Sequence, residues 1–156
     1  MISPEILRRF PFFSFMNDAQ LKAVAMIAEE KNYKIGDGVF DAGAPADALY
    51  FLIDGSVAYY YIVTSEHDPY YKREYYISDL NPGDIFGISA LIEPYIYTAA
   101  VRADKLCKAI KINASALRTL CDADTKLSNG LMYALAKAAM ERLQLTRVQL
   151  IAAAKP

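Results

Sequence analysis

The sequence contains no tryptophan, one histidine and two cysteines in 156 residues. One histidine cannot supply the two or three imidazole ligands of a typical metal-dependent enzyme. His67 also stands between Glu66 and Asp68 in a polar stretch, where we expect it to be exposed and poorly placed to hold haem. Two cysteines are too few for a disulfide framework or a four-cysteine iron–sulfur cluster. We therefore expect no catalysis, no metal and no cofactor.

The chain also lacks a strong net charge and a long apolar run. Seventeen basic and eighteen acidic side chains leave a formal charge of −1, so no overall field attracts a polyanion such as DNA. No apolar run reaches the roughly 18 residues of a membrane span, and the N-terminus lacks the layout of a signal peptide. Cys107 and Cys121 lack C-x-x-C spacing and suit a reducing compartment. We expect a cytoplasmic protein that does not contact a membrane.

What is present divides the chain into three parts. Residues 1–30 carry helical signals, residues 34–112 form short extended segments punctuated by glycine, and residues 113–153 return to a helical period. Twelve tyrosines and seven phenylalanines favour strands, because half-buried rings pack well on a pleated surface. We therefore predict one domain over residues 1–156, mainly β with flanking helices, in which a β-roll is preceded by short helices and followed by a long one.

Turn and cap residues predict where several elements begin and end. Ser3-Pro4-Glu5 starts a short helix that Pro11 stops, and Asn17 or Asp18 caps a second helix. Asp54-Gly55 lies between extended segments 48–54 and 56–63 and predicts a hairpin there. The polar stretch Thr64 to Lys72 predicts an exposed hairpin loop, and Asn81-Pro82-Gly83-Asp84 predicts a tight turn.

The last helix, capped by Asp122 or Asp124, has one narrow polar stripe and a wide apolar arc. Packing against one roll needs less apolar surface than this arc offers, so we expect the helix to contact a second chain as well. The alternative is complete burial within one chain. The interface residues predicted for a homodimer are Leu131, Leu135, Ala138, Ala139, Leu143 and Leu150.

Three motifs carry a resemblance to a known family. Residues 43–57, Gly-Ala-Pro-Ala-Asp-Ala-Leu-Tyr-Phe-Leu-Ile-Asp-Gly-Ser-Val, are similar to a G-x-P-A-D-x-x-Y-x-I-x-x-G-x-V signature. Residues 83–88 and 97–103 are similar to the two ends of a Gly-Asp-x-Phe-Gly-Glu to Arg-x-Ala-x-Val cassette. The chain thus resembles the cyclic-nucleotide-binding domain family, which includes the sensor domains of catabolite-activator-type regulators.

The resemblance implies a double-stranded β-helix or jelly roll, a regulatory role and a ligand pocket at the cassette. The pocket residues it implies are Phe86, Gly87, Ile88, Ser89, Ala90, Tyr97, Thr98 and Ala99. A DNA-reading helix-turn-helix would follow the long helix in such a regulator, and since the sequence stops at Pro156 we expect none in this chain.

Two substitutions in the cassette alter the expected chemistry. The resemblance places Ile88 where the family has a glutamate for the ribose hydroxyl, and Tyr97 where it has an arginine for the cyclic phosphate. A buried phosphate monoanion needs positive charge or several oriented donors, and a tyrosine offers one neutral hydroxyl. Losing both contacts weakens binding by roughly three orders of magnitude. We therefore predict weak or absent binding of cAMP and cGMP.

Other cations are poor substitutes. Arg102 is an odd number of positions past Tyr97 and should point to the opposite face of a continuous strand. Lys72 and Arg73 approach the pocket only if their segment folds over it. Several hypotheses remain open: the pocket takes a different, neutral or weakly polar small molecule; its own side chains fill it and the roll is a scaffold for a protein partner; or the domain is a conventional cyclic-nucleotide receptor.

Overall fold

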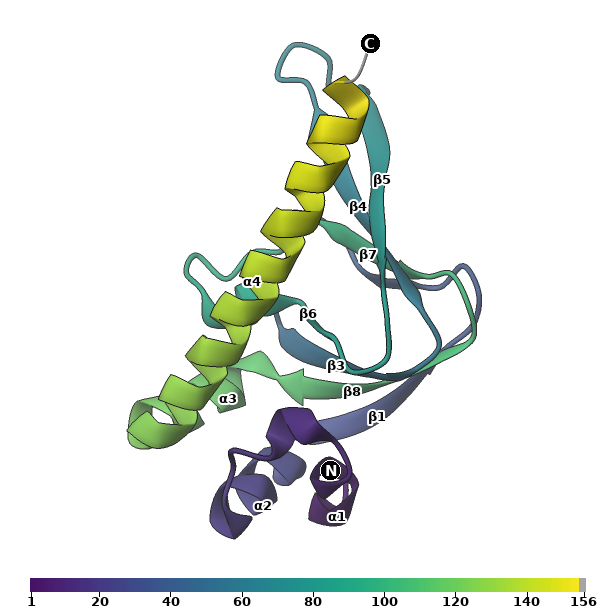
Figure 1. The fold of residues 1–156 in the computed structure, drawn as a ribbon. Coiled ribbons are helices and arrows are strands. Elements are labelled where there is room, and N and C mark those ends of the chain that lie inside the picture. The colour runs from purple at the N-terminus through teal and green to yellow at the C-terminus, as the bar shows by residue number, and fades with distance from the viewer. Residues whose placement is uncertain (155–156) are drawn as a thin grey trace.

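The structure is a computed structural model that describes residues 1–154. Figure 1 shows a roll of two curved sheets, with short helices at the N-terminal end and a long helix running the length of the molecule. In chain order the elements are α1 (Pro4–Arg8), η1 (Pro11–Phe13), α2 (Asp18–Met26), β1 (Ala28–Tyr33), β2 (Gly38–Phe40), β3 (Ala48–Asp54), β4 (Val57–Thr64), β5 (Lys72–Leu80), β6 (Ile85–Phe86), η2 (Ile88–Leu91), β7 (Ala100–Ala103), β8 (Cys107–Asn113), α3 (Ala114–Ala123) and α4 (Thr125–Ala154).

Within residues 1–154 the strands form two four-stranded antiparallel sheets. One sheet has the order β1-β8-β3-β6 and the other β2-β7-β4-β5. Every pairing between these strands is antiparallel. This arrangement confirms the predicted mainly β jelly roll with flanking helices.

The roll begins earlier than the sequence indicated. β1 pairs with β8 from Ala28↔Ile112 to Tyr33↔Cys107, so residues 28–30 belong to a strand and not to the N-terminal helices. The segment Ala28-Glu29-Glu30-Lys31 consists of good helix formers, which hides the strand in the sequence. Pairing with the buried strand β8 overrides that local preference.

The predicted hairpin at Asp54-Gly55 is wrong. β3 pairs with β8 and β6 in one sheet, whereas β4 pairs with β5 and β7 in the other, so this dipeptide carries the chain from one sheet to the next. Gly55 has φ 85, as a tight corner requires. A Cβ atom there would lie 2.4 Å from the carbonyl oxygen of Leu106, so the corner packs directly against the start of β8.

Pro11 does not stop the first helix, because α1 already ends at Arg8 and Pro11 begins η1. Four other turn and cap predictions are confirmed. Ser3 caps α1, and Asn17 forms a capping box with Gln20 at the start of α2. The loop of residues 65–71 joins β4 to β5 in a long hairpin. The Asn81-Pro82-Gly83-Asp84 turn closes with a 3.0 Å hydrogen bond from the amide of Asp84 to the carbonyl of Asn81.

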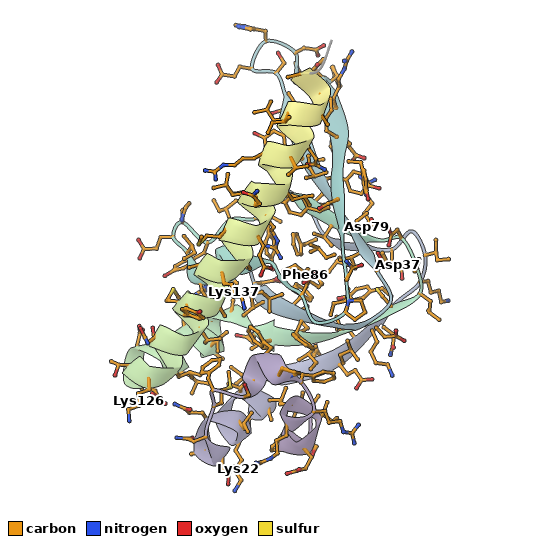
Figure 2. All side chains as sticks on the ribbon, viewed as in Figure 1. Lys22, Asp37, Asp79, Phe86, Lys126 and Lys137 are labelled. Atoms are coloured by element: carbon orange, nitrogen blue, oxygen red, sulfur yellow. The ribbon has the colours of Figure 1, made fainter. Side chains whose placement is uncertain are left out.

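Helix α4 follows the roll along its whole length (Figure 1). Its first half buries Leu127, Leu131 and Leu135 in the core shared with the N-terminal helices. Further along, Arg142 donates to the carbonyl oxygen of Ile85 in β6, and Gln149 donates to that of Ile77 in β5. Figure 2 shows Phe86 inside the roll, with Lys126 and Lys137 projecting from the first half of α4. No helix within residues 1–154 combines the length and hydropathy needed to cross a membrane.

Candidate ligand pocket

The cassette turns sharply at Gly87, between β6 and η2. Gly87 has φ 72, and a Cβ atom on it would lie 3.0 Å from the carbonyl oxygen of Ala48 and 3.2 Å from the ring of Tyr97. Both the positive φ and these close approaches require glycine. The turn therefore places the start of η2 directly beside Tyr97 and the start of β3.

Tyr97 is a structural residue that contacts the first residue of strand β3. Its side chain is buried, and its hydroxyl donates to the carbonyl oxygen of Ala48 at 2.6 Å and accepts from the amide of the same residue at 3.1 Å. β6 pairs only with Tyr50 and Phe51, so it does not reach Ala48, and the phenol supplies the missing partner. The ring of Tyr97 stacks on Phe40 with centroids 3.7 Å apart and an angle of 12° between planes. Burial raises the pKa of Tyr97 to about 12, so the phenol stays neutral.

A cavity of about 210 Å³ remains beside Tyr97. Its lining residues are Phe40, Tyr59, Gly87, Ile88, Ser89, Tyr97, Thr98, Ala99, Ala139 and Arg142. Six of the eight predicted pocket residues are in this set. Phe86 and Ala90 are not, because both side chains are buried in the core. Tyr97 thus fills part of the space at the cassette while leaving a smaller hollow open.

The cation in this cavity is Arg142, which the sequence motifs did not include. It projects from α4 with its guanidinium on the carbonyl oxygen of Ile85, and within residues 1–154 it forms no ion pair. Burial lowers the pKa of Arg142, which marks the charge as desolvated. A signal was present: Arg142 continues the four- and three-residue steps of the buried Leu131 and Leu135 and the half-buried Ala138. A charge in register with a buried face indicates a specific partner or ligand.

The cations considered from the sequence lie elsewhere. Arg102 pairs with Glu74 and its guanidinium carbon lies 4.6 Å from the ring centroid of Tyr60, outside the cavity lining. β7 begins only at Ala100, so Tyr97 and Arg102 do not share the continuous strand that the spacing argument assumed. Lys72 and Arg73 are exposed at the start of β5. Neither lines the cavity. Arg142 is therefore the positively charged residue among those that line it within residues 1–154.

A second arginine ties the cassette to α3. Arg118 donates to the carbonyl oxygen of Ala90 at 2.6 Å, and its guanidinium carbon lies 4.1 Å from the ring centroid of Tyr95. Tyr95 has φ 59, a conformation that costs free energy for a residue other than glycine. Arg142 therefore holds the cassette at β6, through the carbonyl of Ile85, and Arg118 holds it at η2, through the carbonyl of Ala90.

The residues predicted for a dimer interface separate into two groups along α4. Leu131 and Leu135 are buried in the core of their own chain, and Ala138 packs partly against it. Ala139, Leu143 and Leu150 are exposed, with Leu143 at 50% and Leu150 at 68%. The apolar surface available to a partner therefore lies in the second half of α4.

Metal and cysteine chemistry find no site in the described part of the chain. Residues 1–154 contain no group of three or more His, Cys, Asp or Glu side chains that could hold a metal ion. His67 is exposed in the β4–β5 loop. Cys107 and Cys121 are free thiols, and burial raises the pKa of both, which favours the protonated form.

Comparison with known proteins gives consistent matches. The sequence model of the family described as cyclic nucleotide-binding domain matches residues 30–124. A putative cyclic nucleotide-binding protein from Geobacter metallireducens GS-15, known from a crystal structure at 1.90 Å resolution, is 38% identical; the match covers 92% of this chain and 99% of that one, with a TM-score of 0.78.

Two curated relatives are more distant and longer. A CRP-like cAMP-activated global transcriptional regulator of Mycobacterium tuberculosis is 26% identical over 133 residues, which are 85% of this chain and 57% of the regulator. A cAMP-dependent protein kinase regulatory subunit of Dictyostelium discoideum is 25% identical over 118 residues, 75% of this chain and 35% of the subunit. The chain therefore spans little more than half of the regulator and about a third of the kinase subunit.

Proposed function

The chain belongs to the cyclic nucleotide-binding domain family, and on that basis we propose that it is a regulatory, non-catalytic domain that senses a small molecule other than cAMP or cGMP in the cavity between the cassette and α4. The observation that carries this proposal is the position of Tyr97. Its hydroxyl serves the backbone of β3, so the space that the family resemblance assigns to a phosphate-binding arginine holds a neutral, immobile phenol.

Size and charge both argue against a cyclic nucleotide. Pockets for drug-sized ligands usually measure about 300–1,000 Å³, whereas this cavity measures about 210 Å³. It cannot grow at Tyr97 without breaking two hydrogen bonds and a ring stack. Ile88 offers the ribose no acceptor. Arg142 supplies a cation, of which one N–H group donates to the carbonyl of Ile85 and the others remain for a ligand.

Arg142 also gives the ligand a direct route to α4. A molecule bound to the guanidinium contacts α4 and the cassette at once, since Ala139 and Arg142 line the same cavity as Gly87 and Ile88. Ligand binding shifts an equilibrium only by the difference in affinity between two states. A ligand that bridges the cassette and α4 favours the arrangement in which the helix is docked on the roll.

The second half of α4 supports a homodimer as the form of the protein that responds to the ligand. Exposed apolar side chains gather there, including Met140, Leu143, Val148, Leu150 and Ile151. Contiguous apolar surface of this kind on one helix suits a second copy of the same helix. Light scattering on the chain should give twice its 17.4 kDa mass, and Leu143→Glu with Leu150→Glu should return it to the monomer. A monomeric parent chain would refute this part of the proposal.

Two further elements of the proposal rest on composition and relatives. The two free thiols support a reducing compartment, the cytoplasm, as the place where the protein works. The names of the matched relatives, a transcriptional regulator and a kinase regulatory subunit, support a regulatory role over a catalytic one.

Isothermal titration calorimetry with cAMP and cGMP tests the main proposal. A receptor of micromolar affinity that loses its arginine and glutamate contacts should fall to a Kd weaker than about 100 μM. A Kd tighter than that for either nucleotide would mean that Arg142 replaces the missing arginine, and would make the domain a conventional receptor.

A further inference from the structure

The cavity beside Tyr97 combines one fixed charge with apolar walls, and this combination restricts the chemistry of its ligand. The charge is the guanidinium of Arg142, for which no carboxylate of residues 1–154 forms an ion pair. The other lining residues include no Asp, Glu, Lys or His. Asp84 and Glu141 act on Arg142 only from beyond ion-pair distance. A half-buried guanidinium without a directly paired carboxylate is costly, so a bound anion would stabilise the folded chain as well as occupy the cavity.

The single positive charge of Arg142 favours a ligand with a single negative charge. A carboxylate is a monoanion and matches the planar fork of one guanidinium with two parallel hydrogen bonds. A phosphate monoester carries a charge near −2 at neutral pH, so half of it would remain uncompensated against apolar walls. One arginine therefore favours a carboxylate over a phosphate monoester.

The walls set the shape of the remainder of the ligand. Three rings, those of Phe40, Tyr59 and Tyr97, line the cavity together with the aliphatic side chain of Ile88. Aromatic rings pack well against other rings in stacked or edge-to-face arrangements. Ser89 and Thr98 add two hydroxyls that suit a polar ring substituent. A volume of about 210 Å³ leaves room for one ring and its acid group.

We propose that the ligand of this cavity is a small aromatic monocarboxylate, whose acid group pairs with Arg142 and whose ring lies among Phe40, Tyr59 and Tyr97. This inference rests on the proposed sensing function and names the chemical class that the site takes. The acid binds to α4 and the ring to the roll, so the ligand joins the two parts of the molecule.

Thermal shift and calorimetry on the intact chain test the class with matched probes. The aromatic acids are benzoate, 4-hydroxybenzoate and phenylacetate; the controls are benzamide, which lacks the charge, acetate, which lacks the ring, and inorganic phosphate. At a concentration about 100 times Kd, an aromatic acid should raise Tm by about 5 to 10 °C. Benzamide should bind at least about tenfold more weakly than benzoate, and acetate and phosphate should leave Tm unchanged.

Paired variants assign the effect to this cavity. Arg142→Met should abolish the shift, whereas Arg147→Met, an exposed arginine on the same helix, should retain it. If Arg142→Met does not fold, Ala139→Leu fills the cavity without altering its charge, and Ala136→Leu is its exposed control on α4. Loss of the shift in Ala139→Leu but not in Ala136→Leu supports the site.

Three results would overturn the proposed class. They are equal affinity for benzamide and benzoate, a shift with phosphate or acetate that matches the aromatic acids, and no shift with any aromatic acid. None of them touches the proposed sensing function, whose failure is a separate result, the tight binding of cAMP or cGMP in calorimetry.

Discussion

Removing the hydroxyl of Tyr97 should destabilise the fold far more than removing any exposed tyrosine hydroxyl. In Tyr97→Phe the ring stack on Phe40 remains, but the amide and the carbonyl of Ala48 lose the hydroxyl that serves both. Ala48 is fully buried, so bulk water cannot replace the phenol.

The magnitude follows from these two groups. A buried backbone group left without a partner costs about 1–3 kcal/mol. A water molecule entering from the adjacent cavity relieves part of that cost, so the free energy of unfolding should fall by about 2–4 kcal/mol. In a domain of this length the fall corresponds to a decrease in Tm of about 5 to 15 °C.

Urea unfolding followed by far-UV circular dichroism measures this difference, which suits a chain without tryptophan. The control is Tyr61→Phe, because Tyr61 is 52% exposed, and its effect should stay within about 0.5 kcal/mol. Equal stabilities for the two variants would show that the phenol does not hold the start of β3. The structural argument against a nucleotide at this position would then fail as well.

Three further predictions test other contacts. Arg118→Met should lower the free energy of unfolding by about 1–3 kcal/mol, because it leaves the buried carbonyl of Ala90 without its donor; calorimetric unfolding beside Arg147→Met checks this, and equal stabilities would contradict it. Gly55→Ala should prevent stable folding, since its Cβ would overlap the start of β8. Gly36→Ala has a similar φ but open space around the added Cβ, so it should cost only about 1–2 kcal/mol of stability. Circular dichroism compares the two variants, and a stably folded Gly55→Ala chain would contradict the prediction. A hydrogen bond with the carboxyl of Asp104 raises the pKa of Asp79, so above that pKa two negative charges repel each other and the pair destabilises the fold. Asp79→Asn should therefore raise Tm, and the gain in Tm should grow as the pH rises from about 4 to about 7. A gain that stays constant with pH would contradict this account.

The parts of the fold that local chemistry decides were predictable from the sequence. The caps at Ser3 and Asn17 and the turn at Gly83 depend on residues within a few positions, and all three are as predicted. The corner at Gly55 was not, because Asp-Gly favours a positive φ whether the following strand returns beside its neighbour or crosses to another sheet. That choice depends on β8, which contacts Gly55 from more than fifty residues along the chain. β1 was missed for a similar reason, since its pairing partner is also β8.

The candidate site was also predictable only in part. The cassette motif located Gly87, Ile88 and Tyr97, and they line one cavity. The motif did not reveal that the hydroxyl of Tyr97 serves the backbone of Ala48, because that contact depends on how short β6 is. It also did not include Arg142, which lies 45 positions after Tyr97 on an element that meets the cassette only in the folded chain.

The phenol of Tyr97 at the start of β3 also limits how this chain can change by mutation. Any substitution that brought a guanidinium to position 97 would remove the partner of two main-chain groups before it added affinity for a phosphate. The first mutational step toward nucleotide recognition therefore lowers stability, and a second, compensating change must accompany it. Such a barrier would preserve an altered specificity over long periods, even where selection for the new ligand is weak.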